Sequence, residues 1–164
     1  MLLALLLKLL HVLTSIWFIS GLLGRWVTLG QAARSDNIRT TRALTDLAGR
    51  FERTMVIPGS LILLVTGLLT AWAQKQPLLG FLQDASTNWL LVSLVLYLST
   101  IPLIPWVFLP RGRRFVQALD QASTREEVTP ELQAAFANRA VAASHVYELL
   151  NVCVILILMV TKPF

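Results

Sequence analysis

Residues 2–24 read LLALLLKLLHVLTSIWFISGLLG, and this stretch decides the fold class. A helix needs about 20 mainly apolar residues to cross the hydrocarbon core of a bilayer, and Lys8 is the only charged residue here. Three further apolar stretches of similar length follow at residues 55–73, 89–109 and 140–161. We therefore predict an all-α protein, a four-helix transmembrane bundle that forms one membrane domain over residues 1–164.

The composition supports the lipid bilayer as the surroundings of this chain. Hydrophobic residues make up 55% of the sequence and charged residues only 14%, against about 25% charged residues in soluble domains. The net charge of +5 would suggest nucleic acid in a soluble protein. Here the basic residues lie beside apolar spans, without interleaved aromatic residues, so we expect no nucleic-acid partner.

The basic residues also predict the orientation of the chain, since Lys and Arg collect on the cytoplasmic side. The segment between the first two spans has six of them and the segment between the last two has five, against Lys75 and Lys162 on the opposite side and Lys8 within the first span. The two sets are Arg25, Arg34, Arg39, Arg42, Arg50 and Arg53, then Arg111, Arg113, Arg114, Arg125 and Arg139. We predict a multi-pass protein of the bacterial inner membrane with both termini outside the cytoplasm.

Two of the helices should extend beyond the membrane into the cytoplasm. Leu44, Leu47, Phe51 and Met55 recur at helical spacing, so helix 2 should begin near residue 36. Thr129 before Pro130 is typical of a helix N-cap and first position, and helix 4 could run unbroken from there to its end.

The third helix carries its own interruption. Pro102 and Pro105 remove backbone donors within residues 89–109 and should kink or break its inner end.

Polar residues within the spans are the candidates for function. Lys8, His11 and Ser15 share one face of helix 1, while His145, Glu148 and Asn151 form a stripe on helix 4: this spacing places each set on one side of its helix. A charge at membrane depth costs roughly 3 kcal/mol on insertion scales. We therefore expect these side chains to face the protein interior or a cofactor.

Depth estimates from helical rise separate the two histidines. His11 and Asn151 lie at similar depth, about 14–15 Å below the surface, and His145 lies roughly 10 Å further in. The two histidines should therefore not share one metal ion. His11 is either a single haem ligand or a hydrogen-bonded structural residue.

The remaining polar residues and the cysteine each have a structural interpretation, and Lys8 also has a functional one. Lys8 either reaches to the outer surface or lies beside a bound anionic or porphyrin group. Glu148 should be paired with His145 or with a helix 1 residue such as Ser15. Cys153 lies in an apolar run and is interpreted as a small packed or lipid-facing residue.

Three stretches together indicate a family. They are Lys8-Leu-Leu-His11 followed by Trp17-Phe18 and Gly21; Phe51-Glu52-Arg53 leading to Ile57-Pro58 and Gly67; and Asn151 with the ending Val160-Thr161-Lys162-Pro163-Phe164. They resemble the HemJ-type protoporphyrinogen oxidases. As a whole, including the apolar run that begins at Trp89, the chain is still more similar to a sister group. That group comprises predicted bacterial integral membrane proteins classed as a domain of unknown function, in the same broad class as the copper-resistance D proteins.

The HemJ resemblance implies haem b held by a membrane histidine. Carried over by position, His11 would be the axial ligand and metal-binding residue, with Lys8 as its companion at the cofactor. The chain departs from the pattern at Ser93, where those oxidases carry Lys, and at Val152, where they carry Glu. Both differences remove charges expected near a porphyrin.

The sequence leaves three functions open. The first is a redox protein built around haem b or another porphyrin on His11. The second is a non-catalytic accessory or structural subunit of a larger membrane complex, or a homo-oligomer, in which the polar stripe only joins helices. The third is copper handling, for which the sequence has no Met-rich or His-rich cluster.

Overall fold

The computed structural model describes residues 2–83 and 86–163, and every regular element within those residues is a helix. In order, the elements are α1 (Leu2–Ala32), α2 (Ile38–Phe51), η1 (Glu52–Val56), α3 (Ile57–Ala73), η2 (Gly80–Gln83), α4 (Trp89–Leu98), η3 (Ile104–Phe108), α5 (Leu109–Arg125), α6 (Pro130–Phe136) and α7 (Arg139–Thr161). The prediction of an all-α chain is confirmed.

Three helical segments among the described residues are long and apolar enough to cross a membrane: Leu2–Ala32, Ile38–Ala73 and Pro130–Thr161. They contain three of the four predicted spans, residues 2–24, 55–73 and 140–161. Many leucines of α1 face outward, as expected for a surface in contact with lipid rather than water.

The third predicted span, residues 89–109, is not one continuous helix, so a count of four membrane-spanning helices is not confirmed. The apolar helix α4 ends at Leu98, turns occupy residues 99–102, and the widened helical turn η3 follows. Pro102 and Pro105 lie at this break. Neither has a backbone N–H to donate, so a regular helix is interrupted here. The predicted interruption of this segment is confirmed.

The second predicted helix does begin well before its apolar part. The Asn37 side chain caps α2 by accepting hydrogen bonds from the backbone N–H groups of Arg39 and Thr40. The helix continues through η1, whose wider π turn directly precedes Pro58 at the start of α3. An extra residue in this turn accommodates the missing proline donor, a common cause of π turns in helices.

The fourth predicted helix differs from an unbroken helix that starts at Pro130. Thr129 does cap α6, accepting a hydrogen bond from the backbone N–H of Leu132 at 3.3 Å. However, α6 ends at Phe136, and Asn138 starts a new helix by accepting from the N–H groups of Ala140 and Val141. The asparagine cap competes with helix continuation at this point, and hydropathy could not reveal it.

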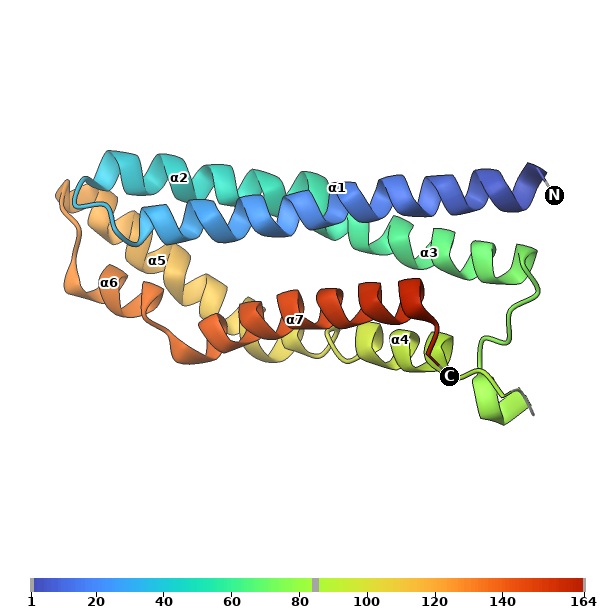
Figure 1. Cartoon of the computed structure of the whole chain (residues 1–164). Coiled ribbons are helices and arrows are strands. Elements are labelled where there is room, and N and C mark those ends of the chain that lie inside the picture. The colour runs from blue at the N-terminus through green and yellow to red at the C-terminus, as the bar shows by residue number, and fades with distance from the viewer. Residues whose placement is uncertain (1, 84–85, 164) are drawn as a thin grey trace.

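The helices are arranged as two pairs: the first is α1 with the α2–η1–α3 segment, and the second is α4 with α7 (Figure 1). α1 packs along α2, η1 and α3, while α4 packs on α7. Glycines allow the first pair to approach closely: a Cβ added at Gly21 would lie 2.6 Å from Cβ of Met55, and one at Gly59 would lie 3.2 Å from Cβ of Phe18. The second pair lies beside the first, and α1 and α7 run in opposite directions.

We call the end of the molecule where α1 begins and α7 finishes the terminal end, and the other end the loop end (Figure 1). At the loop end a small core joins α2 to α5 and α6 through Ile38, Leu119, Ala122 and Leu132. Arg42 of α2 also donates to Asp120 of α5 at 2.8 Å. These contacts hold the two pairs together beyond the apolar part of the molecule.

Candidate functional site

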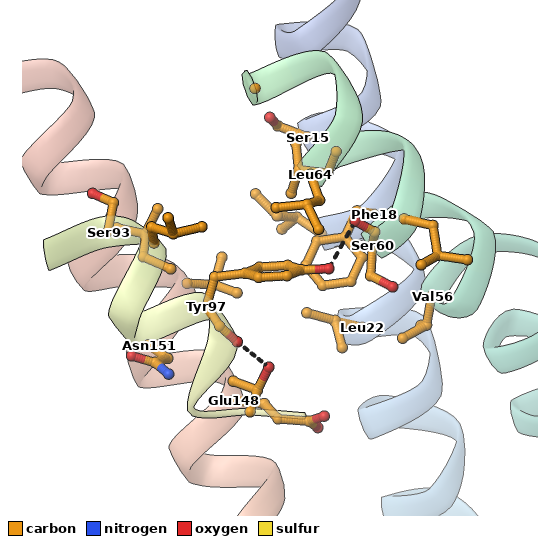
Figure 2. A pocket seen from close by; sticks show the side chains of 18 of the residues that line it. Ser15, Phe18, Leu22, Val56, Ser60, Leu64, Ser93, Tyr97, Glu148 and Asn151 are labelled. Carbon is orange, nitrogen blue, oxygen red and sulfur yellow. Dashed lines mark hydrogen bonds between the residues drawn. The ribbon is translucent and has the colours of Figure 1, made fainter. Parts of the chain in front are cut away.

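A cavity of about 300 Å³ lies between the two helix pairs. Its walls come from α1, η1 and α3 on one side and from α4, η3 and α7 on the other. Figure 2 shows side chains of both pairs pointing toward one another, including Phe18 and Leu22 of α1 opposite Tyr97 of α4. Most lining residues are apolar, so the cavity is suited to an apolar ligand with a few polar contacts.

His11 of α1 lines this cavity and is tied to α3. Its Nδ1 lies 3.1 Å from the Thr66 hydroxyl oxygen. That hydroxyl also lies 2.7 Å from the carbonyl oxygen of Ile62. When its proton is directed at that carbonyl, the oxygen accepts from the imidazole, so that Nδ1 carries the histidine proton and Nε2 has the free lone pair.

Gly67 makes room for the imidazole. A Cβ added at this position would lie 3.0 Å from Cε1 of His11, closer than ordinary van der Waals contact. The ring therefore lies directly on the backbone of α3, and that helix determines its position. Such a second contact usually orients a histidine that binds metal.

Four side chains form a polar cluster at the loop end of the cavity, which we call the Arg25 cluster. Arg25 of α1 forms ion pairs with Glu52 of η1 and, at 2.6 Å, with Glu148 of α7. Nη2 of Arg25 also lies 3.1 Å from Nδ1 of His145. The His145 ring stacks on Phe108 of η3, with centroids 5.0 Å apart. The cluster therefore connects both helix pairs.

The predicted pairing of Glu148 with His145 is present, with Oε2 and Nδ1 3.3 Å apart. Ser15, the other suggested partner, lines the cavity but donates to the carbonyl of His11 at 2.7 Å. The sequence analysis missed Arg25 and Glu52 as partners. Arg25 lies on the face of helix 1 that carries the other polar residues, and this was the available signal.

Asn151 lines the cavity, and its side-chain amide contacts residues 96 and 99. Its amide donates to the carbonyl of Leu96 at 2.8 Å and lies 3.3 Å from the Ser99 hydroxyl. The neighbouring Tyr97 donates to the carbonyl of Ser60 at 3.0 Å, one residue from Gly59, which contacts Phe18. These hydrogen bonds join α7 to α4 and α4 to α3.

The two histidines are separated, as their depths predicted. His145 contacts Arg25, which follows His11 by fourteen residues on α1, roughly 21 Å of helical rise. Lys8 is exposed and lies outside the cavity lining. It is therefore not brought to the same site as His11.

The hydroxyl groups of the cavity wall donate hydrogen bonds to backbone carbonyls. This holds for Ser15, Ser60, Ser93, Tyr97 and Thr100. The charged groups in the lining are the carboxylates Glu52 and Glu148, both at the loop end. The wall thus offers acceptors but few donors, and it repels an anionic group at the loop end.

The described residues contain no group of three or more His, Cys, Asp or Glu side chains that could hold a metal ion. Cys153 is exposed, in line with a lipid-facing position.

Comparison with known families gives one match. Residues 5–163 match the family described as "Predicted integral membrane protein (DUF2269)". The comparisons with curated proteins and with solved structures found no match. Together with the three apolar helical segments, the family match identifies an integral membrane protein in contact with the lipid bilayer.

Proposed function

We propose, for a chain that belongs to the predicted integral membrane protein family (DUF2269), a redox function inside the bilayer. In this proposal haem b, or a related porphyrin, is held between the two helix pairs with His11 as axial ligand. The supporting observation is that His11 lines the cavity while its Nδ1 lies 3.1 Å from the Thr66 hydroxyl oxygen of α3.

The chemistry of the imidazole suits this role. A neutral histidine brings no charge into an apolar site, and its unprotonated Nε2 can bind iron without first losing a proton. By accepting from Nδ1, Thr66 would keep the ring in this tautomer, as outer partners of metal-binding histidines do. The resemblance of the Lys8–His11 stretch to the HemJ-type oxidases adds to the proposal but does not identify the reaction.

The rest of the cavity fits the ring better than its propionates. The apolar walls suit the faces of a porphyrin, while Glu52 and Glu148 exclude carboxylates from the loop end. Among the described residues that line the cavity there is no Lys or Arg side chain to pair with a propionate. The cavity volume of about 300 Å³ is at the small end of the range for ligand pockets.

When bound, haem would supply reversible one-electron chemistry at its iron. The chain itself would hold the ring through His11, keep water out with its apolar walls, and separate the ring from the Arg25 cluster. Since Ser93 and Val152 stand where HemJ-type oxidases carry charge, we propose a redox role without assigning protoporphyrinogen as substrate.

The visible absorption spectrum tests the proposal directly. Protein purified in mild detergent from haem-replete cells should show a Soret band. The His11→Ala variant should lose this band. The His145→Ala variant should keep it, because His145 contacts Arg25, which is roughly 21 Å of helical rise from His11 along α1. A folded wild-type protein without Soret absorbance would instead favour the second function, an accessory subunit in which the Arg25 cluster only joins the helix pairs.

A further inference from the structure

Three arginines stand close together at the start of α5, where the apolar α4–η3 segment ends. Residues 85–110 contain no charged side chain, and Arg111, Arg113 and Arg114 follow directly. From there α5 leads toward the loop end of the molecule (Figure 1). Trp106 of η3, shortly before the arginines, is 75% exposed, as is usual for an aromatic ring at a membrane–water boundary. We call Trp106 and the three arginines the basic patch.

The arginines of the basic patch have no carboxylate partner among the described residues. Each ion pair within the described part of the chain uses a different cation. The first carboxylate that follows the patch in the sequence, Asp120, is held by Arg42 at 2.8 Å. Arg111 and Arg114 are three residues apart on one helix, and like charges at this spacing repel each other. An anion from outside the chain would therefore stabilise this arrangement.

This side of α5 is open to such a partner. Arg113 and Arg114 are exposed, and a Cβ added at Gly112 would meet no atom of another described helix within 4 Å. Leu109 and Val116, on either side of the arginines, are 52% and 53% exposed. The patch thus presents positive charge beside exposed apolar side chains, which matches a molecule with an anionic part and an apolar part.

A backbone contact holds one of the arginines at the end of the apolar segment. Pro110 has no N–H, so the carbonyl of Trp106, four residues earlier, loses its α-helical donor. Nη1 of Arg111 donates to this carbonyl at 3.1 Å. A guanidinium has five N–H donors, so Arg111 keeps others for a second acceptor. Its charge is therefore positioned next to the exposed tryptophan, where lipid headgroups would lie.

We infer that the basic patch binds the phosphate of an anionic phospholipid at the loop end, with the acyl chains against Trp106 and Leu109. Guanidinium groups match phosphate oxygens with two parallel hydrogen bonds. Basic clusters that directly follow a membrane segment are attracted to the anionic lipids of the cytoplasmic leaflet, the side on which the arginine distribution predicts the loop end. This interaction goes beyond the proposed redox function and does not depend on haem.

Quenching of Trp106 fluorescence by brominated lipids tests the inference. The protein is reconstituted into vesicles of phosphatidylcholine and phosphatidylglycerol in equal amounts, and only one of the two lipids carries bromine. The signal of Trp106 is the difference between the wild type and Trp106→Phe, since the chain has five tryptophans. Brominated phosphatidylglycerol should quench this signal more strongly than brominated phosphatidylcholine. The difference should shrink in 1 M salt, where the screening length falls to about 3 Å. Equal quenching by the two lipids at low salt would overturn the inference.

Two double variants, each made with and without Trp106→Phe, separate the basic patch from general positive charge. Arg113→Gln with Arg114→Gln should reduce the preference for phosphatidylglycerol by about fivefold or more, since each arginine near an anionic surface contributes roughly that factor. Arg34→Gln with Arg125→Gln removes the same charge from exposed positions outside the patch and should keep the preference. Circular dichroism confirms that both variants are folded. An unchanged preference in the first variant, or an equal loss in both, would contradict the assignment to the patch.

Inorganic phosphate distinguishes a lipid from a free anion. Added phosphate should weaken the preference no more than sodium chloride of the same ionic strength, because a soluble anion lacks the apolar contacts with Trp106 and Leu109. A much stronger effect of phosphate would show that the patch binds free phosphate, and the lipid assignment would fail. None of these measurements involves haem, so their outcome is independent of the Soret test of the proposed function.

Discussion

Arg25 of α1 and Glu148 of α7 are joined by an ion pair of 2.6 Å, although 123 positions separate them in the sequence. The same guanidinium also holds Glu52 of η1. The arginine side chain is 10% exposed and that of Glu148 is 17% exposed, so the pair is largely removed from solvent. One cation therefore stabilises two carboxylates at the junction of both helix pairs, which makes Arg25 the critical member of its cluster.

Arg25→Leu should strongly destabilise the protein. The substitution would leave Glu52 and Glu148 near one another without their cation, and removal of one partner from a buried ion pair costs about 3–5 kcal/mol. Denaturant unfolding in detergent micelles, followed by helical circular dichroism, measures this loss.

Removing the carboxylates as well should recover most of the stability lost in Arg25→Leu. The triple variant Arg25→Leu, Glu52→Gln, Glu148→Gln has no uncompensated charge, so its free energy of unfolding should approach that of the wild type. Equal stability of the single variant and the wild type would show that the cluster contributes nothing to the fold.

Close approach of α1 to η1 predicts opposite effects for two glycines of the same helix. Gly21→Ala would bring a Cβ within 2.6 Å of Met55 Cβ and should destabilise by about 1–3 kcal/mol through overpacking. Gly30→Ala meets nothing within 4 Å, so it should be neutral or stabilise by up to about 1 kcal/mol through helix propensity. The same unfolding assay compares the two variants, and an equal effect at both positions would contradict the packing argument.

Thr66→Val should weaken haem binding without removing His11. The variant loses the oxygen that accepts from Nδ1, so the tautomer of the imidazole is no longer determined. Loss of such an outer partner typically costs 10–100-fold in metal affinity. Haem titration of the apoprotein measures the change.

Thr70→Val is the matched control for that titration, because Thr70 donates only to the carbonyl of Thr66 one turn further along α3. Its haem affinity should stay within about twofold of the wild type, since His11 keeps its acceptor. Thr66→Ser should also bind haem normally. An unchanged affinity in Thr66→Val would remove the main support for His11 as the ligand.

Much of the fold could be predicted from hydropathy and local signals. The lengths of the apolar stretches predicted the long helices, the periodicity of Leu44, Leu47 and Phe51 predicted α2, and the Thr129-Pro130 pair predicted the start of α6. These signals act within a few residues of the chain. Their physical causes are therefore visible without knowledge of tertiary contacts.

The errors arose where a local cap or a distant contact decided the outcome. Asn138 interrupts the last helix because its side chain caps α7, although the surrounding residues favour continuation. The prolines of the third span did indicate a break, but not that α4 would end as early as Leu98.

The site was predicted in part for the same reason. Helical spacing brought His145 to Glu148, since three residues on one helix are neighbours. Arg25 was interpreted as an orientation signal because its partners lie 27 and 123 positions away.

The orientation of the chain remains a prediction that reporter fusions can test. The loop end carries most of the arginines, including those of α2 and α5, and should lie in the cytoplasm. Alkaline phosphatase, which is active only outside the cytoplasm, should be active when fused after Lys75 or after the last residue of the chain. Fusions after Ser35, between α1 and α2, and after Glu127, between α5 and α6, should be inactive. The opposite pattern would reverse the orientation, and activity after Lys75 without activity at the end of the chain would mean that the α4–η3 segment does not cross the membrane.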